Sequence, residues 1–296
     1  MSLFRCPLCA APLEAGDRAL RCPKGHSFDR AREGYVHLLP PNRKHSPLPG
    51  DDREMVLARR DFLSGEYYRP LLNTLCNQLL ALPGESPALL DAGCGEGWYT
   101  AGVCRALRDA GKHPRMAGTD ISKFALRTAA RREREVEFAV ASSYGLPLAD
   151  GSVDGLLNCF SPLALEEFRR VLKPGGRFLY VVPGPEHLWE MKAVLYDRPY
   201  PNEEKETPYP GFAYREIVPV EGRIRLDRRE DMRNLFRMTP YFWKTPKAGA
   251  ERLAALEELE VRISFRVHVF QKEGRGGPAC PPFSRDPGAS GKRADT

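Results

Sequence analysis

A glycine-rich turn that directly follows an apolar strand constrains the fold of this chain more than any other segment. Residues 88–92 read Ala-Leu-Leu-Asp-Ala, and Gly93, Gly95 and Gly97 follow before a helical segment opens. Glycines allow the backbone to turn sharply and to approach a ligand closely. Further strands are predicted at 115–120, 136–140, 153–159 and 177–182, with helices between several of them. This alternation predicts a doubly wound α/β sheet.

The spacing of these glycines distinguishes between two cofactor classes. The dinucleotide fingerprint G-x-G-x-x-G, counted from Gly93, requires a glycine at the position that Trp98 occupies. The chain instead has Asp-x-Gly-x-Gly-x-Gly starting at Asp91, which resembles motif I of class I methyltransferases that use S-adenosylmethionine (SAM). Asp120 ends the next strand, where a carboxylate can accept hydrogen bonds from both ribose hydroxyls. Taken alone, Asp120 also fits a helix cap ahead of Ser122.

Three of the eight cysteines lie within the first 22 residues and form a second motif. Cys6 and Cys9 are a Cys-x2-Cys pair, and Cys22 and His26 form a Cys-x3-His pair twelve residues later. Three thiolates and one imidazole make a closed tetrahedral set, which is typical of structural zinc. Gly25 allows a positive φ just before His26. Because so short a segment cannot build a core of its own, zinc binding is expected to fold it.

The division of the chain follows from these two motifs. We predict a zinc-binding domain at 1–38, a basic, proline-rich linker and helix at 39–65, a SAM-dependent methyltransferase domain at 66–272 and a disordered tail at 273–296. Asp51 or Asp52 is the expected cap of the helix in the linker. Further elements are predicted as helices at 67–81, 228–237 and 248–258 and a strand at 261–270.

Composition excludes some classes of protein. No run approaches the ~20 apolar residues that a membrane span needs, and the first residues lack a secretory signal pattern. The other five cysteines are scattered singly, which is typical of a reducing cytoplasm. The net charge is +6, and residues 1–50 hold eight basic and four acidic residues. This local excess favours a polyanionic partner, although a solvated basic face is the alternative.

The two motifs in one chain resemble the bacterial 23S rRNA (guanine-N1)-methyltransferases, a family that includes a tylosin-resistance methyltransferase. The resemblance runs from about Cys6 to Phe270. The stretches that carry it further are Glu33-Gly-Tyr-Val, Asp91 to Thr100, Val140-Ala-Ser-Ser143, Pro183-Gly-Pro with His187-Leu, and Met238-Thr-Pro-Tyr-Phe-Trp243.

The resemblance implies a Rossmann-like methyltransferase domain behind a small zinc domain, and a homodimer whose cleft holds a hairpin of 23S rRNA. It implies zinc on Cys6, Cys9, Cys22 and His26. The implied SAM contacts are Tyr68, Asp91, Gly93, Gly95, Glu96, Gly97, Asp120 and His187. Tyr68 is alternatively an aromatic residue on a helix face, and His187 a helix cap.

The chemistry leaves the proton acceptor open. Guanine N1 carries a proton at neutral pH, which a carboxylate, a main-chain carbonyl near Phe160–Pro162 or a water can accept. Asn158 lies where many amino-group methyltransferases carry an Asp or Asn, and we name it only as a positioning residue. Because N1 is buried in a base pair, the base must come from a loop or be flipped out.

Candidate RNA contacts are aromatic and basic. Tyr35, His37, Arg43, Lys44 and His45 lie beside the zinc motif, and Tyr241, Phe242 and Trp243 are expected either to line a base pocket or to pack in the core.

Two other functions fit the motifs. The first is a small-molecule SAM methyltransferase with a structural zinc ribbon, and the second is a non-catalytic zinc-containing RNA-binding protein.

Overall fold

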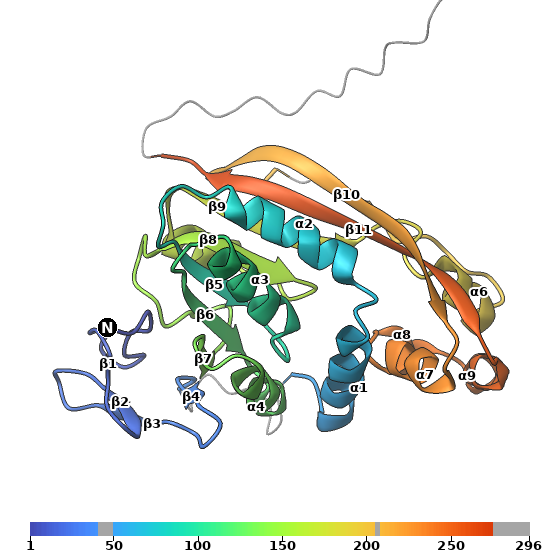
Figure 1. The fold of residues 1–296 in the computed structure, drawn as a ribbon, viewed down its shortest axis with the longest axis horizontal. Coiled ribbons are helices and arrows are strands. Elements are labelled where there is room, and N and C mark those ends of the chain that lie inside the picture. Colours follow the sequence, from blue (N-terminus) through green and yellow to red (C-terminus); the bar gives the residue numbers. More distant parts are fainter. Residues whose placement is uncertain (41–49, 205–207, 275–296) are drawn as a thin grey trace, which may run out of the picture.

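The computed structural model describes residues 1–40, 50–204 and 208–274, and Figure 1 shows their arrangement. The candidate RNA contacts Arg43, Lys44 and His45 and most of the predicted tail lie outside these ranges. Within them, no helix is both long enough and apolar enough to cross a membrane.

One eight-stranded sheet forms the body of the molecule, in the order β10-β11-β9-β8-β5-β6-β7-β4 (Figure 1). The strands from β9 to β4 are parallel, and β11 and β10 extend the sheet antiparallel. Their bounds are β4 Val36–His37, β5 Ala88–Ala92, β6 Arg115–Asp120, β7 Glu137–Val140, β8 Val153–Cys159, β9 Leu172–Pro183, β10 Phe212–Leu226 and β11 Leu259–Lys272. The expected doubly wound sheet is therefore confirmed.

Successive side chains of the central strands belong alternately to two hydrophobic clusters, one on each face of the sheet. Both faces of these strands are therefore buried. Leu89, Leu157 and Leu179 belong to one cluster, and their neighbours Leu90 and Leu156 belong to the other. The first cluster also contains residues of α2 (Arg69–Leu80), α3 (Trp98–Asp109) and α4 (Lys123–Arg132). Fully buried parallel strands are normally as apolar as these.

The remaining helices are α1 (Arg53–Ser64), which precedes β5 in the chain, and five helices that connect later strands of the sheet. These five are α5 Leu165–Val171, α6 Trp189–Leu195, α7 Arg229–Arg237, α8 Tyr241–Lys244 and α9 Lys247–Ala255. The carboxylate of Asp52 accepts a hydrogen bond of 2.8 Å from the Met55 amide, so Asp52 is the cap of α1. The helices predicted near 67–81, 228–237 and 248–258 correspond to α2, α7 and α9.

Two strands differ from the sequence prediction. A strand is predicted at 177–182, but β9 begins at Leu172, which pairs with Val153 of β8 before a register shift. No strand is predicted within 212–226, whereas β10 covers these 15 residues and pairs with β11 along its length. Several charged residues interrupt the apolar pattern of β10, and pairing with the strongly apolar β11 overrides its weak local signal.

The N-terminal residues form a small ribbon of three antiparallel strands, β1 (Glu14–Ala15), β2 (Ala19–Arg21) and β3 (Ser27–Asp29). The ribbon is joined to the sheet at several points. The Arg5 amide donates to the carbonyl of Pro147 (2.7 Å) and the Leu3 amide donates to Glu137 (3.0 Å). The predicted domain boundary at residue 38 assigns β4 to the zinc-binding domain. In the structure β4 pairs with β7 and is the edge strand of the large sheet.

Candidate functional site

The turn after β5 has the backbone conformation that its glycines allow. Gly93 and Gly97 have φ values of 83° and 82°, in the left-handed region that side chains disfavour. A Cβ at Gly93 would lie 1.8 Å from Oγ of Ser161, and one at Gly97 would lie 2.8 Å from Cβ of Ala129. The absence of a side chain at Gly93 therefore allows the turn after β5 and the loop after β8 to approach closely, and Gly97 lets α3 pack closely against α4.

A cavity of about 330 Å³ opens at this turn. It lies where the strand order reverses, because β6 and β8 lie on opposite sides of β5. Ligands of open α/β sheets bind at such a switch point, beyond the carboxyl ends of the strands. The loops after β5, β6, β7 and β8 all contribute, through Gly93–Glu96, Asp120, Ala141–Tyr144 and Cys159–Pro162.

Two carboxylates, the buried Asp91 and the half-buried Asp120, face this cavity from neighbouring strands. Asp120 accepts hydrogen bonds from the amides of Gly95 (2.9 Å) and Ser122 (2.8 Å), which fixes the glycine turn against the end of β6. Asp91 accepts from the Thr100 hydroxyl (2.6 Å), while its Oδ1 has no hydrogen-bond partner among the described residues. Burial raises the pKa of Asp91 to about 7. An unpartnered, buried carboxylate oxygen fits a cationic ligand such as SAM.

Glu96 points into the protein as well as lining the cavity. It is 2% exposed, and its Oε2 lies 2.7 Å from Nη2 of Arg132. Burial raises its pKa, while the nearby Arg132 charge acts in the opposite direction. The ion pair ties the glycine turn to the last turn of α4.

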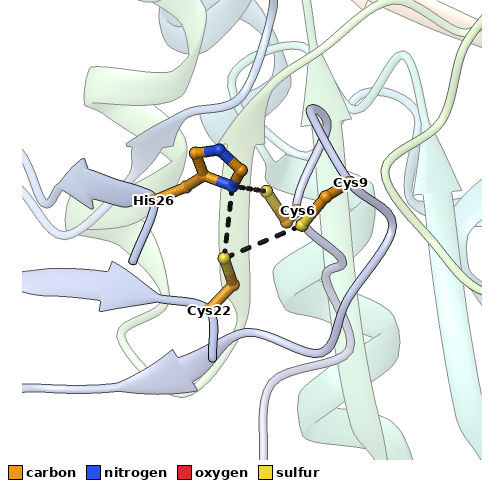
Figure 2. A group of neighbouring side chains, drawn as sticks. All are labelled: Cys6, Cys9, Cys22 and His26. Carbon is orange, nitrogen blue, oxygen red and sulfur yellow. Dashed lines mark hydrogen bonds between the residues drawn. The ribbon is translucent and has the colours of Figure 1, made fainter. Parts of the chain in front are cut away.

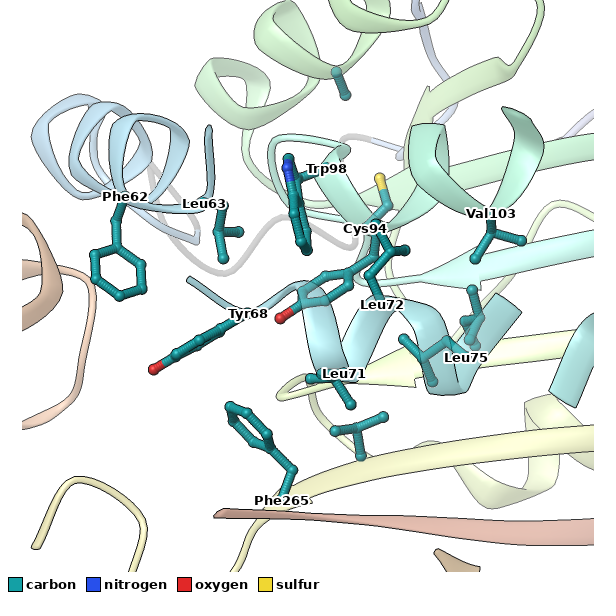
Figure 3. Packing of buried hydrophobic residues seen from close by; sticks show 14 of the residues in the cluster. Phe62, Leu63, Tyr68, Leu71, Leu72, Leu75, Cys94, Trp98, Val103 and Phe265 are labelled. Atoms are coloured by element: carbon teal, nitrogen blue, oxygen red, sulfur yellow. The ribbon is translucent and has the colours of Figure 1, made fainter. Parts of the chain in front are cut away.

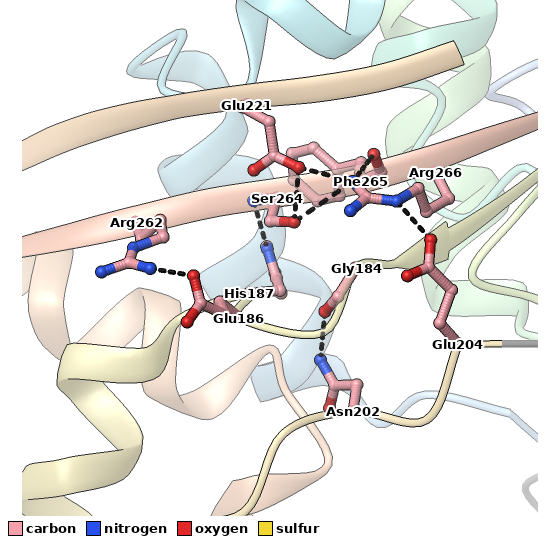
Figure 4. Close-up of polar contacts among 10 residues, drawn as sticks. All are labelled: Gly184, Glu186, His187, Asn202, Glu204, Glu221, Arg262, Ser264, Phe265 and Arg266. Atoms are coloured by element: carbon pink, nitrogen blue, oxygen red, sulfur yellow. Dashed lines mark hydrogen bonds and ion pairs between the residues drawn. The ribbon is translucent and has the colours of Figure 1, made fainter. Parts of the chain in front are cut away.

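Tyr68 and His187 come together in the interior although they are distant in sequence (Figure 3 shows Tyr68 in the core). The Tyr68 hydroxyl lies 3.4 Å from Nε2 of His187, and both rings contact Phe265. Nδ1 of His187 accepts from the Ser264 amide (3.2 Å; Figure 4), so the neutral ring carries its proton on Nε2. Burial, and then the charge of Lys192, lowers the pKa of His187 to about 3.

This aromatic group reaches the cavity through one further ring. Phe265 lies 5.7 Å, between ring centroids, from Phe160, which lines the cavity. Neither Tyr68 nor His187 is itself among the lining residues. Direct contact of these two side chains with SAM therefore stays a prediction.

Asn158 is fully buried behind the loop that follows β8. Its amide nitrogen donates to the carbonyls of Ala92 (3.0 Å) and Pro162 (3.3 Å). These bonds hold the Cys159–Pro162 loop beside the glycine turn. Within that loop Phe160 has φ 54°, a strained value for a residue with a side chain, and it is 47% exposed.

Several candidates lie differently from the sequence expectation. Tyr35 is 7% exposed and packs in the core, so its ring is not accessible for stacking on a base, and this expectation is wrong. Tyr241 and Phe242 pack against the core, Trp243 is exposed, and none of the three lines the cavity. Conversely, no sequence motif singles out Tyr99, which lines the cavity with a buried hydroxyl that has no partner among the described residues.

The four predicted metal ligands converge in the ribbon (Figure 2). Their ligand atoms all lie within 4.8 Å of one another. Nδ1 of His26 lies 3.4 Å from Sγ of Cys6 and 3.3 Å from Sγ of Cys22, and Sγ of Cys9 lies 3.8 Å from Sγ of Cys22. A zinc tetrahedron with usual bond lengths has edges of about 3.5–3.8 Å. The set therefore fits zinc, and Gly25 has the expected positive φ of 84°.

Comparison with known proteins identifies both parts. Residues 4–47 match the model of the N-terminal zinc ribbon of RlmA, and residues 89–176 match a methyltransferase domain. A protein of Micromonospora griseorubida is 39% identical over 86% of this chain and 92% of its own length. It is provisionally named a 23S rRNA (guanine-N1)-methyltransferase. This chain belongs to the 23S rRNA (guanine-N1)-methyltransferase family.

Other members of the family match over different lengths. A Bacillus subtilis relative with the same provisional name is 31% identical over 92% of this chain and 98% of its own. The 23S rRNA (guanine(748)-N1)-methyltransferase of Streptomyces fradiae is 41% identical over 65% of this chain and 67% of its own. The crystal structure of YcgJ from Bacillus subtilis has a TM-score of 0.50 at 16% identity, covering 70% of this chain and all of YcgJ, and shows the shared fold alone. The class I methyltransferase fold with its zinc ribbon agrees with the sequence prediction.

Proposed function

We propose that this protein transfers a methyl group from SAM to N1 of a guanine in a hairpin of 23S rRNA. The observation that carries the proposal is the combination of family membership over nearly the whole chain with a cavity built by the motif I turn. Neither a small-molecule methyltransferase nor a non-catalytic RNA-binding protein explains both. Because the proposed substrate is ribosomal RNA, we place the protein in the cytoplasm. The homodimer that the family resemblance implies is part of the proposal.

The residues that would hold SAM are those around the glycine turn. Asp120 offers carboxylate oxygens where a ribose is expected, and the ionised form of Asp91 attracts a cation. Tyr68, Glu96 and His187 complete the proposed set. When bound, SAM supplies an electrophilic methyl group, so the chemistry lies in the cofactor.

The chain's own contribution is alignment and exclusion of water. Asn158 fixes the loop after β8, whose residues Phe160, Ser161 and Pro162 line the cavity. Because the Pro162 carbonyl already accepts from Asn158, we propose that the carbonyl of Phe160 or Ser161 accepts a hydrogen bond from the target guanine. The zinc ribbon, with Cys6, Cys9, Cys22 and His26 as ligands, is proposed to help bind the RNA.

The test is the modification state of 23S rRNA from cells with and without the gene. Mass spectrometry of nuclease fragments should show one guanine that gains a methyl group only when the protein is present. Reverse transcriptase should stop there, since N1 lies on the Watson–Crick edge. Absence of any new methyl group would reject the proposal, and absence of SAM binding by calorimetry would favour a non-catalytic protein. Tylosin susceptibility of the same two strains tests a resistance role.

A further inference from the structure

A second cleft lies between the ribbon and the end of α4, on a part of the surface that the catalytic cavity does not include. Its volume is about 590 Å³. Arg30 and Arg32 line it from the turn after β3, and Arg131 and Arg134 line it from the end of α4 and the loop that follows. We call this surface the arginine cleft.

The shape of the turn directs two arginines into the arginine cleft. Arg30 and Val36 form an isolated antiparallel β-bridge. Between them, the Ala31 amide donates to the carbonyl of Tyr35 and the Gly34 amide donates to the carbonyl of Ala31, which closes a tight turn. The guanidinium of Arg30 donates to the carbonyl of Gly34 (3.1 Å), which orients it. Arg32 lies at the exposed tip of this turn.

The arginine cleft carries an excess of positive charge. Among the described residues, Glu33 is the only acidic one that lines the cleft, and it pairs with Arg131 at 2.9 Å. Arg32 and Arg134 are exposed and form no ion pair among the described residues. Four guanidinium groups and one carboxylate leave a formal charge of about +3 in a small space, which favours an anion. Guanidinium groups bind phosphate with two parallel hydrogen bonds.

Neighbouring arginines show that this excess is local. Arg108 lies within 4 Å of both Glu133 and Glu135, and Arg132 pairs with buried Glu96. Basic residues in the last turn of a helix also interact favourably with the helix dipole. That effect accounts for Arg131, but Arg30 and Arg32 come from a different segment and gain nothing from it.

The arginine cleft lies close to the catalytic cavity along the chain and in space. Arg131 faces the arginine cleft through its ion pair with Glu33, whereas Arg132 faces the glycine turn through Glu96. Adjacent residues of one helical turn thus contact the two sites.

We propose that the arginine cleft binds the sugar-phosphate backbone of the RNA substrate, with Arg32 and Arg134 as its free phosphate ligands. This inference rests on the proposed function and adds to it a site that includes both the ribbon and α4. Backbone contacts fix the position of a nucleic acid without reading its bases.

The test uses the full-length, zinc-loaded protein with Arg32→Ala and Arg134→Ala combined, and unmodified 23S rRNA transcribed in vitro. We expect the dissociation constant to rise about tenfold or more at 0.15 M salt, and the slope of log K against log salt to flatten by about 1.5–2. The matched control combines Arg215→Ala and Arg225→Ala on β10, at the opposite edge of the sheet. It removes the same net charge and should leave the slope unchanged.

The possible results separate the two proposals. If the wild-type protein methylates 23S rRNA while the cleft variant binds it like the control, the arginine cleft is not a phosphate site and the proposed function stands. Weaker binding with an unchanged salt slope also overturns the cleft proposal, because the lost contacts are then not ionic. If the wild-type protein neither binds nor methylates 23S rRNA, both proposals fail. Zinc content and SAM affinity equal to wild type show that the variant is folded.

Discussion

The hydroxyl of Tyr68 lies 3.4 Å from Nε2 of His187, although 119 residues separate the two positions. The contact joins the start of α2 to the segment between β9 and α6, and Ser264 of β11 holds the other ring nitrogen. Figure 4 shows how the surrounding polar side chains connect the segment between β9 and α6 with β11, and β11 with β10. A buried, neutral histidine thereby takes a defined orientation beside the proposed SAM site.

We predict that His187 does not contribute to the pH dependence of SAM binding. Its pKa is lowered to about 3, so the ring is neutral from pH 5.5 to 8 and its hydrogen bonds do not change. His187→Gln and His187→Ala should both raise the dissociation constant, the second more, and neither should alter its dependence on pH. Calorimetric titrations across this range check the prediction. A wild-type step near pH 6.5 that disappears in His187→Gln would contradict it.

Gly93→Ala should weaken SAM binding by at least tenfold. The left-handed conformation costs a residue with a side chain about 1–2 kcal/mol, and the new methyl group would overlap Ser161. Gly84→Ala is the matched control, because Gly84 has nearly the same φ, 82°, with nothing within 4 Å of an added Cβ. Its loss of stability measures the backbone cost alone. Equal SAM affinities in the two variants would show that Gly93 does not shape the cavity.

The stability of the SAM-free protein should fall between about pH 4 and pH 7 because of Asp91. Its pKa is about 7 when folded and about 4 when unfolded, so the folded state binds the extra proton between these values. As pH rises through this window, ionising the buried carboxyl lowers the free energy of unfolding by at most about 4 kcal/mol. Asp91→Asn should lack this component.

Urea unfolding of wild type and Asp91→Asn at several pH values checks this prediction. Both proteins carry the same zinc ribbon, so the difference between their curves cancels any effect of pH on the metal site. A difference that stays constant with pH would show that Asp91 titrates normally.

Removing one metal ligand should remove the metal and loosen one face of the sheet. Cys6 and Cys22 belong to the same buried cluster as Phe4, Leu90 and Phe178, so the ribbon and the sheet share a core. Cys22→Ser should lose its zinc and melt at a lower temperature, measured by elemental analysis and thermal unfolding. SAM affinity should change little, since the cavity is formed by loops of the sheet. Cys76→Ser, which replaces a buried thiol outside the cluster, should keep one zinc per chain.

Sequence reasoning located the elements whose signals are local. The five central strands and the turns around Gly93 and Gly25 follow from apolar runs and glycine positions. β10 and the length of β9 depend on pairing with other strands, and this is not visible in one segment. The burial of Tyr35 and the accessibility of Phe160 likewise depend on which elements meet. The charge of residues 1–50 indicated a basic surface, but only the structure brings Arg131 and Arg134 to it.

The pairing of β4 with β7 has a consequence for synthesis of the protein. Val36 and its partner Ala139 are separated by about a hundred residues, so β4 leaves the ribosome long before its neighbour exists. Domains usually fold in the order of translation, and the ribbon has its four metal ligands within its first 26 residues. Zinc is thus able to organise the N-terminal segment early, before the strands of the sheet that pack against it have been synthesised. A low zinc concentration would then impair folding of the N-terminal segment during translation, rather than the activity of the folded enzyme.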